Sequence, residues 1–304
     1  MKLKYACIWS VLSLLGACDN SHEGDWTAQD KQEPKPLCLE VQQEIATKDQ
    51  VLGTSFPSGA ALGVFLTASG GTDYDGLAHK NVSYTSDGTA EAQTWAVDPS
   101  HPINLSPTTG TAYAYYPYKS GVNYQDMTAI PISNDGTDWM YNQTPSTNLS
   151  NLNNTAQFTM RHACVIIRCS IHLGTYVGVG LVNSVKVQCD GFATGAVMDL
   201  TVPEVKNLTG TGSAIINTIN QTMSGTDIVT DFWAIPTGSP ATVTFTVDVD
   251  GSTYVATKAD FTAVAGAVYP FELTMNAVEA EVSLSSIDPW IFDDKGEVFP
   301  APTN

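Results

Sequence analysis

The sequence predicts an all-β protein whose strands pack as β-sandwiches or barrels. From about residue 60 onward, short runs rich in Val, Thr, Ile, Tyr and Phe alternate with clusters of Gly, Pro, Asn and Asp, a pattern typical of short strands joined by turns. Asp250-Gly251 separates two such runs and is the strongest hairpin signal in the chain. Beyond the N-terminus, no apolar repeat is sustained at the 3.6-residue period of a helix.

Six runs carry the strand pattern most clearly. Ala61–Thr67 is an apolar run of strand length, and the aromatic run Thr111–Tyr118 is broken near its end by Pro117, which cannot donate to a ladder. In Phe158–His172, apolar residues recur at period two and so share one face. That face holds Val165, Ile167, Cys169 and Ile171. The two strands of the hairpin are Thr242–Val249 and Ser252–Thr257, and the last predicted strand is Ala267–Met275.

The length of 304 residues predicts two domains, because one domain usually holds roughly 100–200 residues. The stretch 142–155 is rich in Asn, Ser and Thr and has the composition of a linker or long loop. We therefore expect an N-terminal domain over 49–155 and a C-terminal domain over 156–304, with a further loop at 207–213.

The N-terminus has the pattern of an export signal with a lipid-attachment cysteine. Met1–Lys4 is basic, residues 5–15 are apolar, and Leu15-Gly16-Ala17-Cys18 reads as a lipobox. A run this short does not span a membrane, which needs about 20 apolar residues. We expect residues 1–17 to be a signal peptide, Cys18 to be lipidated and 18–48 to follow as a tether; an ordinary signal peptide is the alternative.

The composition argues against nucleic acid as a partner. The chain has 13 Lys+Arg against 31 Asp+Glu, a formal charge of −18, and its only arginines are Arg161 and Arg168. Phosphate backbones would repel such a surface. Of the six cysteines, Cys164, Cys169 and Cys189 lie in the predicted C-terminal domain, where a Cys169–Cys189 bridge and buried thiols both remain open.

No catalytic or cofactor motif is found. The sequence contains no HExxH, GxSxG or phosphate-binding loop, and no cysteine spacing typical of zinc. The acidic turn at Asp248-Val249-Asp250-Gly251 lacks the glycine and the final acid of a calcium loop. Two of the many carboxylates could still converge in the fold, but we expect a non-enzyme without a metal or cofactor.

Both ends of the chain carry an isolated strand pattern. Near the start, Leu37, Leu39, Val41 and Ile45 share one face, and polar residues with Lys48 follow. Near the end, Val282 and Leu284 alternate with polar residues before Ile287, Trp290 and Phe292. A strand of this kind can dock on its own domain or extend a sheet of another subunit.

At these residues the chain resembles the fimbrillins of Bacteroidetes, lipoprotein pilins of type V pili. The resemblance covers the whole precursor and depends on the order of several segments rather than on one signature. They are the lipobox, IATK with FPSGAALGVF, TAYAYYPY, FTMRHACVIIRCSI, FWAIPTG, VDGSTYVATK, AVYPFELTM and IDPW.

The resemblance implies two transthyretin-like β-sandwich domains in tandem and assembly at the outer membrane. A trypsin-like protease would cut the Lys48–Asp49 bond, and the first strand with Leu37, Leu39, Val41 and Ile45 would leave. The C-terminal segment 278–304 of another copy or a related pilin would then fill the groove as donor strand. Its apolar residues would be Val282, Leu284, Ile287, Trp290 and Phe292.

Three functions follow from these patterns. The first is a polymerising pilus subunit; fimbrillins commonly have arginine at the processing position, so Lys48 requires a protease that accepts lysine. The second is a lipid-anchored tip, anchor or stand-alone adhesin that does not polymerise and binds a host or bacterial surface. The third is a glycan-binding surface lipoprotein, for which tryptophans could supply stacking platforms. The tryptophans considered are Trp26, Trp95, Trp139, Trp233 and Trp290.

Overall fold

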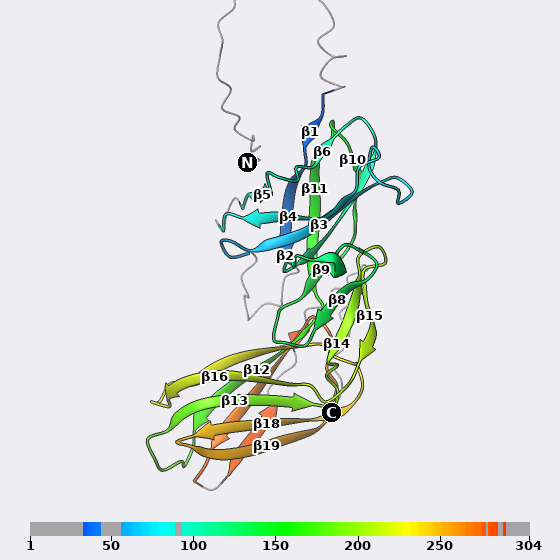
Figure 1. The fold of residues 1–304 in the computed structure, drawn as a ribbon. Coiled ribbons are helices and arrows are strands. Elements are labelled where there is room, and N and C mark those ends of the chain that lie inside the picture. Colours follow the sequence, from blue (N-terminus) through cyan, green and yellow to red (C-terminus); the bar gives the residue numbers. More distant parts are fainter. Residues whose placement is uncertain (1–32, 44–55, 89–92, 278, 285–287, 290–304) are drawn as a thin grey trace, which may run out of the picture.

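The chain forms two β domains arranged end to end (Figure 1). The computed structural model describes residues 33–43, 56–88, 93–277, 279–284 and 288–289. Within these ranges the one helical element is the single 3-10 turn η1, Val122–Tyr124, and no helix is long and apolar enough to cross a membrane. The predicted all-β fold in tandem domains is confirmed.

The N-terminal domain is one eight-stranded sheet that curls over its own core. In Figure 1, β3, β4 and β5 cross the direction of β2 and β11, and the core lies between these two layers. Phe56, Tyr84 and Phe158 are fully buried in this core. The strands follow the order β2 (Cys38–Gln43), β11 (Thr155–His162), β9 (Met140–Asn142), β7 (Gly110–Tyr116), β3 (Ala61–Ala68), β4 (His79–Ser86) and β5 (Trp95–Val97), with β10 (Ser146–Leu149) beside β7 and a separate pair formed by β1 (Lys35–Pro36) and β6 (Asn104–Leu105).

The C-terminal domain is a sandwich of two sheets around a second core. Phe232, Phe245 and Phe271 fill its centre, and the aromatic rings of Phe245 and Phe271 lie 4.8 Å apart. One sheet has the order β17 (Ile228–Ala234), β12 (Val165–Leu173), β20 (Ala267–Met275) and β21 (Ala280–Leu284), with β22 (Asp288–Pro289) also on β20; the other has β16 (Ala214–Thr222), β13 (Leu181–Cys189), β18 (Ala241–Val249) and β19 (Ser252–Phe261).

The hairpin between β18 and β19 turns at the predicted dipeptide. Asp250 and Gly251 have φ angles of 53° and 77°, and a two-residue turn with both angles positive matches the right-handed twist of the strands it joins. The strand face predicted in β12 is also confirmed, because all four of its residues lie in the core of the C-terminal domain.

A small third sheet joins the domains. β8 (Ile130–Ser133) comes from the N-terminal half, and it pairs with β14 (Gly195–Asp199), which pairs with β15 (Glu204–Thr209). A third apolar cluster surrounds this sheet and includes Trp139, whose indole Nε1 donates to the Ser133 carbonyl at 3.1 Å. Ladder bonds and buried apolar area together resist bending between the domains.

The polar stretch 142–155 is not the boundary between the sheets. It contains β10 and the start of β11, and β11 pairs within the N-terminal sheet as far as His162. The chain passes between the domains at Ala163–Cys164, where two small buried residues separate β11 from β12. Polar composition does not mark a linker here, because these polar residues lie in turns and strands of the N-terminal sheet, and two of them, Asn142 and Asn151, are buried.

Cys169 and Cys189 carry free thiols, so the open alternative is settled in favour of the reduced form. Cys169 lies on β12 and Cys189 on β13, strands of opposite sheets that share no ladder. Burial raises the pKa of both thiols and of Cys164, which lowers their reactivity.

The junction cluster predicts a large effect of Trp139→Ala. The side chain is 1% exposed, and removing a buried tryptophan costs on the order of 3–5 kcal/mol. We expect urea unfolding to show that loss, with hydrogen exchange accelerating first in β8 and β14. Val255→Ala, at a position 56% exposed on β19, should change the free energy of unfolding by less than about 0.5 kcal/mol. Equal effects of the two variants would contradict the role of the cluster.

Candidate functional site

β2 is an edge strand that runs parallel to the last strand of its domain. It pairs with β11 in a continuous register from Thr155↔Cys38 to Met160↔Gln43, and it lies at the end of the sheet order, with β11 as its single strand neighbour among those described. The C-terminal domain repeats this arrangement, because its first strand β12 runs parallel to its last long strand β20. There, however, β12 is internal, with β17 on its other side.

The inner face of β2 completes the N-terminal core. Leu37 and Leu39 are 4% and 7% exposed, and Val41 packs against the same cluster. The Leu37 N–H donates to the Ile103 carbonyl at 2.9 Å, and nearby the pair of β1 with β6 extends the attachment. Burying each such aliphatic side chain stabilises the domain by about 1.5–3 kcal/mol.

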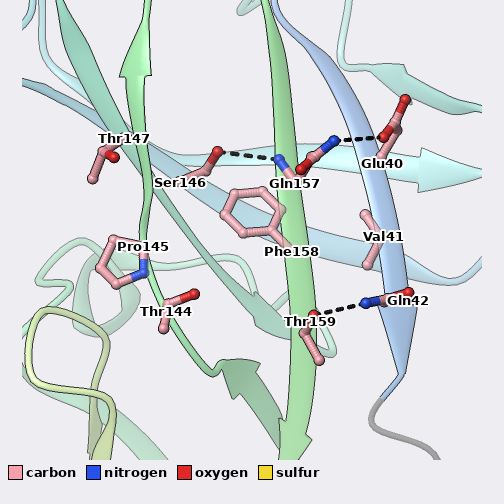
Figure 2. A pocket seen from close by; sticks show the side chains of 10 residues that line it. All are labelled: Glu40, Val41, Gln42, Thr144, Pro145, Ser146, Thr147, Gln157, Phe158 and Thr159. Carbon is pink, nitrogen blue, oxygen red and sulfur yellow. Dashed lines mark hydrogen bonds between the residues drawn. The ribbon is translucent and has the colours of Figure 1, made fainter. Parts of the chain in front are cut away.

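The outer face of β2 is held to β11 by side-chain hydrogen bonds. Gln157 Nε2 donates to Glu40 Oε2 at 3.1 Å, and Gln42 Nε2 donates to Thr159 Oγ1 at 2.9 Å. Figure 2 shows both bridges, which cross from one strand to the next. Since these groups are solvent-exposed, each bridge adds little to stability, and the hold of β2 depends on its ladder and its apolar face.

A polar hollow of about 580 Å³ lies beside β2 and β11. Its opposite side is lined by residues 144–147, at the break in strand structure between β9 and β10. Pro145 has no N–H to donate at this point. Figure 2 shows Ser146 reaching across to the Gln157 backbone, whose N–H donates to the Ser146 Oγ at 3.1 Å.

Because strand pairing is interrupted between β9 and β10, the first part of β11 depends on β2 for its ladder hydrogen bonds. β9 pairs only with Met160–His162 of β11, whereas the five residues before Met160 contact that side through isolated bonds such as Gln143 N to Thr159 O. Among the described strands, β2 alone provides those five residues with a regular ladder. Without β2, this part of β11 would be an unpaired strand edge, and the apolar side chains that β2 covers would be exposed.

The C-terminal strand lies on its own domain. β21 pairs antiparallel with β20 from Met275↔Ala280 to Phe271↔Leu284, and β22 pairs with its beginning. Val282 and Leu284 pack against the core but are only partly buried. β21 is therefore a second edge strand, with an apolar face at the same two-residue spacing as β2.

Several predicted site residues lie outside the described residues. These are Cys18, Ile45, Lys48, Asp49, Ile287, Trp290 and Phe292. Of the rest, the structure places Leu39 and Val41 on β2, with Leu37 directly before it on the same core cluster, and Val282 and Leu284 together on β21. The role of β11 as the partner of β2 was not predicted, although the alternation of polar and buried residues in β11 signals a strand with one solvent face.

No group of metal-binding side chains occurs in the described part of the chain. Trp95 and Trp139 are buried, and the Trp233 ring stacks on His162 with centroids 5.6 Å apart. His162 Nδ1 in turn lies 2.7 Å from Asp138 Oδ1, and burial raises the pKa of that carboxyl. These three tryptophans are used in packing and form no exposed platform for a sugar.

Comparison with known proteins identifies the family. A family model described as fimbrillin-like matches residues 46–290. The chain belongs to the fimbrillin-like family. The match begins after β2 and includes the rest of the N-terminal domain, the C-terminal sandwich, β21 and β22. A comparison with curated proteins gives no match.

Three solved structures share the fimbrillin-like fold of this chain. A protein of Bacteroides ovatus assigned to cell adhesion is 18% identical with a TM-score of 0.66, covering 86% of this chain and 100% of its own. One from Bacteroides uniformis is 20% identical with a TM-score of 0.62, covering 84% and 98%. One from Bacteroides fragilis is 12% identical with a TM-score of 0.57, covering 86% and 100%. At these identities the likeness concerns the fold.

The two faces of β2 predict unequal effects of substitution. Leu39→Ala removes a buried side chain and should lower the free energy of unfolding by about 2–5 kcal/mol, with faster hydrogen exchange at the β11 amides. Gln42→Ala removes one exposed hydrogen bond and should cost less than about 1 kcal/mol. Urea unfolding monitored by circular dichroism measures both. If Gln42→Ala proved as damaging as Leu39→Ala, the hold of β2 would not depend on its apolar face.

Proposed function

We propose that this chain is a fimbrial subunit that is exported as a lipoprotein precursor, matured by cleavage after Lys48 and polymerised by strand exchange. The cell surface is then its location, adhesion its role, and other copies or related pilins its partners. Membership of the fimbrillin-like family and the fold shared with proteins assigned to cell adhesion support this role. The single observation that carries the polymerisation step is the edge position of β2 on β11.

The position of β2 suits a removable strand. It precedes Lys48 by five residues, so a cut there would leave β1 and β2 attached only by non-covalent contacts. Their loss leaves the rest of the N-terminal sheet connected in its strand order. Removal of the equivalent strand of the C-terminal domain would instead separate β17 from β20.

The apolar pattern of β21 suits the vacated groove. Ala280, Val282 and Leu284 alternate with polar residues as Leu37, Leu39 and Val41 do. On β20 these side chains are partly buried, whereas the positions of Leu37 and Leu39 are buried. Bound in a groove of that depth, the apolar side chains of β21 would be more deeply buried than they are on β20. This difference in buried apolar surface drives exchange.

A lipid-anchored subunit that does not polymerise is the second candidate. The observation in its favour is the docking of β21 on β20 through five residue pairs, because a strand that never leaves its own domain donates nothing. The presence of Lys48 where fimbrillins commonly have arginine also favours it when the available protease cuts only at arginine. For a glycan-binding lipoprotein, the packing of Trp95, Trp139 and Trp233 gives no support.

Controlled proteolysis tests maturation. Protein lacking residues 1–18 is treated with a lysine-cleaving, trypsin-like protease, and its mass and size are followed together. We expect cleavage after Lys48 and then a ladder of oligomers that persists in SDS without heating. Lys48→Gln should stay monomeric, and so should a chain truncated after residue 278. Cleaved protein that stays monomeric would favour the anchored adhesin.

A matched pair of substitutions tests the donor strand. Val282 faces the core of its own domain, and its neighbour Ser283 faces solvent. Val282→Asp places a charge on the inserting face, where an unpaired charge is strongly disfavoured, and should abolish the ladder. Ser283→Asp adds the same charge on the other face and should leave the ladder intact. Equal ladders from both variants would show that β21 is not the inserted strand.

A further inference from the structure

At the end of the C-terminal domain that lies away from the junction, an exposed turn carries apolar side chains and is held in place by hydrogen bonds. The turn covers residues 174–180 between β12 and β13, and Val177 and Val179 are 87% and 74% exposed. Exposed single aliphatic residues are common on proteins, but two on one turn form a small patch. Nothing in the sandwich core requires these two valines.

Asp250 at the β18–β19 hairpin anchors one side of this turn. Its carboxylate accepts hydrogen bonds from the Tyr176 hydroxyl at 2.7 Å, the Gly180 N–H at 2.9 Å and the Leu181 N–H at 2.9 Å. The hydrogen bond from Tyr176 is the main reason that the pKa of Asp250 is lowered, and it raises the pKa of Tyr176 to about 12. These hydrogen bonds therefore fix the backbone of the turn that carries Val177 and Val179.

The other side of the turn is joined to the point where β20 ends and β21 begins. The Gly174 N–H donates to the Met275 carbonyl at 3.0 Å. Thr175 bonds to Asn276 Oδ1 through its N–H and its hydroxyl, and the Ala277 N–H donates to the Thr175 hydroxyl. A strand that leaves β20 in this region thus starts beside Val177 and Val179.

Strand directions place this turn and the acceptor groove at opposite ends of the molecule. β11 runs toward the domain junction, β12 continues from the junction to the turn, and β20 runs parallel to β12. β2 runs parallel to β11 and begins at the far end, as the end-to-end arrangement in Figure 1 shows. A strand leaving the turn of one copy enters the groove of the next at the Thr155 end when it follows the course of β2.

That far end also presents an aliphatic side chain on a rigid turn. Leu152 is 67% exposed in a turn closed by reciprocal backbone hydrogen bonds of 3.0 Å between Ser150 and Asn153. The neighbouring Asn151 donates to the Glu33 carbonyl at 2.9 Å, beside the beginning of β1. Leu152 thus lies at the entrance to the groove.

From these positions we infer that Val177 and Val179 pack against the Leu152 turn of the next copy in the polymer. This contact rests on the proposed strand exchange and adds the end-to-end surface that fixes the orientation of one subunit on the next. It is apolar, which suits copies that each carry a formal charge of −18 and repel one another. The partner is a second copy of this chain.

Disulfide trapping tests the contact. Val177→Cys and Leu152→Cys are made separately in a Cys38→Ser background, mixed, cleaved after Lys48 and oxidised. The remaining thiols at Cys164, Cys169 and Cys189 are buried, so the new cysteines react. The contact predicts a disulfide between subunits that survives heating in SDS and disappears with reductant. The control pairs Val177→Cys with Val122→Cys, which is 83% exposed near the domain junction, and should give no cross-link.

The possible outcomes separate this contact from strand exchange. A reduced sample that shows the SDS-resistant ladder, together with the specific cross-link, supports both. A ladder without the cross-link overturns the contact and leaves strand exchange standing, whereas a cross-link without a ladder supports the contact and overturns strand exchange. If neither the ladder nor the cross-link forms, both the contact and strand exchange are overturned.

Charge substitution provides a second readout. Val177→Asp combined with Val179→Asp should slow ladder growth at least ~10-fold, because two buried aliphatic contacts are lost. The thermal midpoint of the monomer should stay unchanged, since both side chains are exposed. Val122→Asp adds a charge at the exposed position near the domain junction used as the cross-linking control, and should leave the rate unchanged. Equal rates for all three proteins would overturn the contact.

Discussion

The parallel pairing of β2 with β11 is the constraint on which the N-terminal domain depends. A parallel neighbour cannot be joined by a tight hairpin, so the first strand of the domain must come to the last one from a distant part of the sequence. Gln42 and Thr159, which bond across this pair, are 117 positions apart. The same constraint makes β2 separable, since no short turn ties it to β11 and no described strand lies beyond it.

The two domains solve the same topological problem with different consequences. In each, the first strand runs parallel to the last long strand. β12 is internal, flanked by β17 and β20, and its loss would divide a sheet. β2 is at an edge of its sheet, and its loss would expose the edge of β11. The fold therefore has an edge strand in each domain, β2 on β11 in one and the short β21 on β20 in the other.

The two domains are also held together at their junction. The sheet of β8, β14 and β15 crosses the junction, and the cluster around Trp139 surrounds it. His162 adds a hydrogen bond to Asp138 and a stacking contact to Trp233 on β17 of the other domain. Because only Ala163 and Cys164 separate β11 from β12, these contacts join the two domains closely at the junction.

Local chemistry in the sequence was enough for the strand pattern, the Asp250-Gly251 hairpin and the apolar face of Leu37, Leu39 and Val41, since each depends on neighbouring residues and on the two-residue period of a strand. The partner of β2, its parallel direction, the continuation of the N-terminal sheet to His162 and the free thiols of Cys169 and Cys189 were decided only by the tertiary structure. Each of these depends on which distant segments lie together, and a two-residue period is the same whichever strand lies alongside. The edge strands β2 and β21 could thus be recognised as strands from sequence, while their edge positions follow from the order of the sheets.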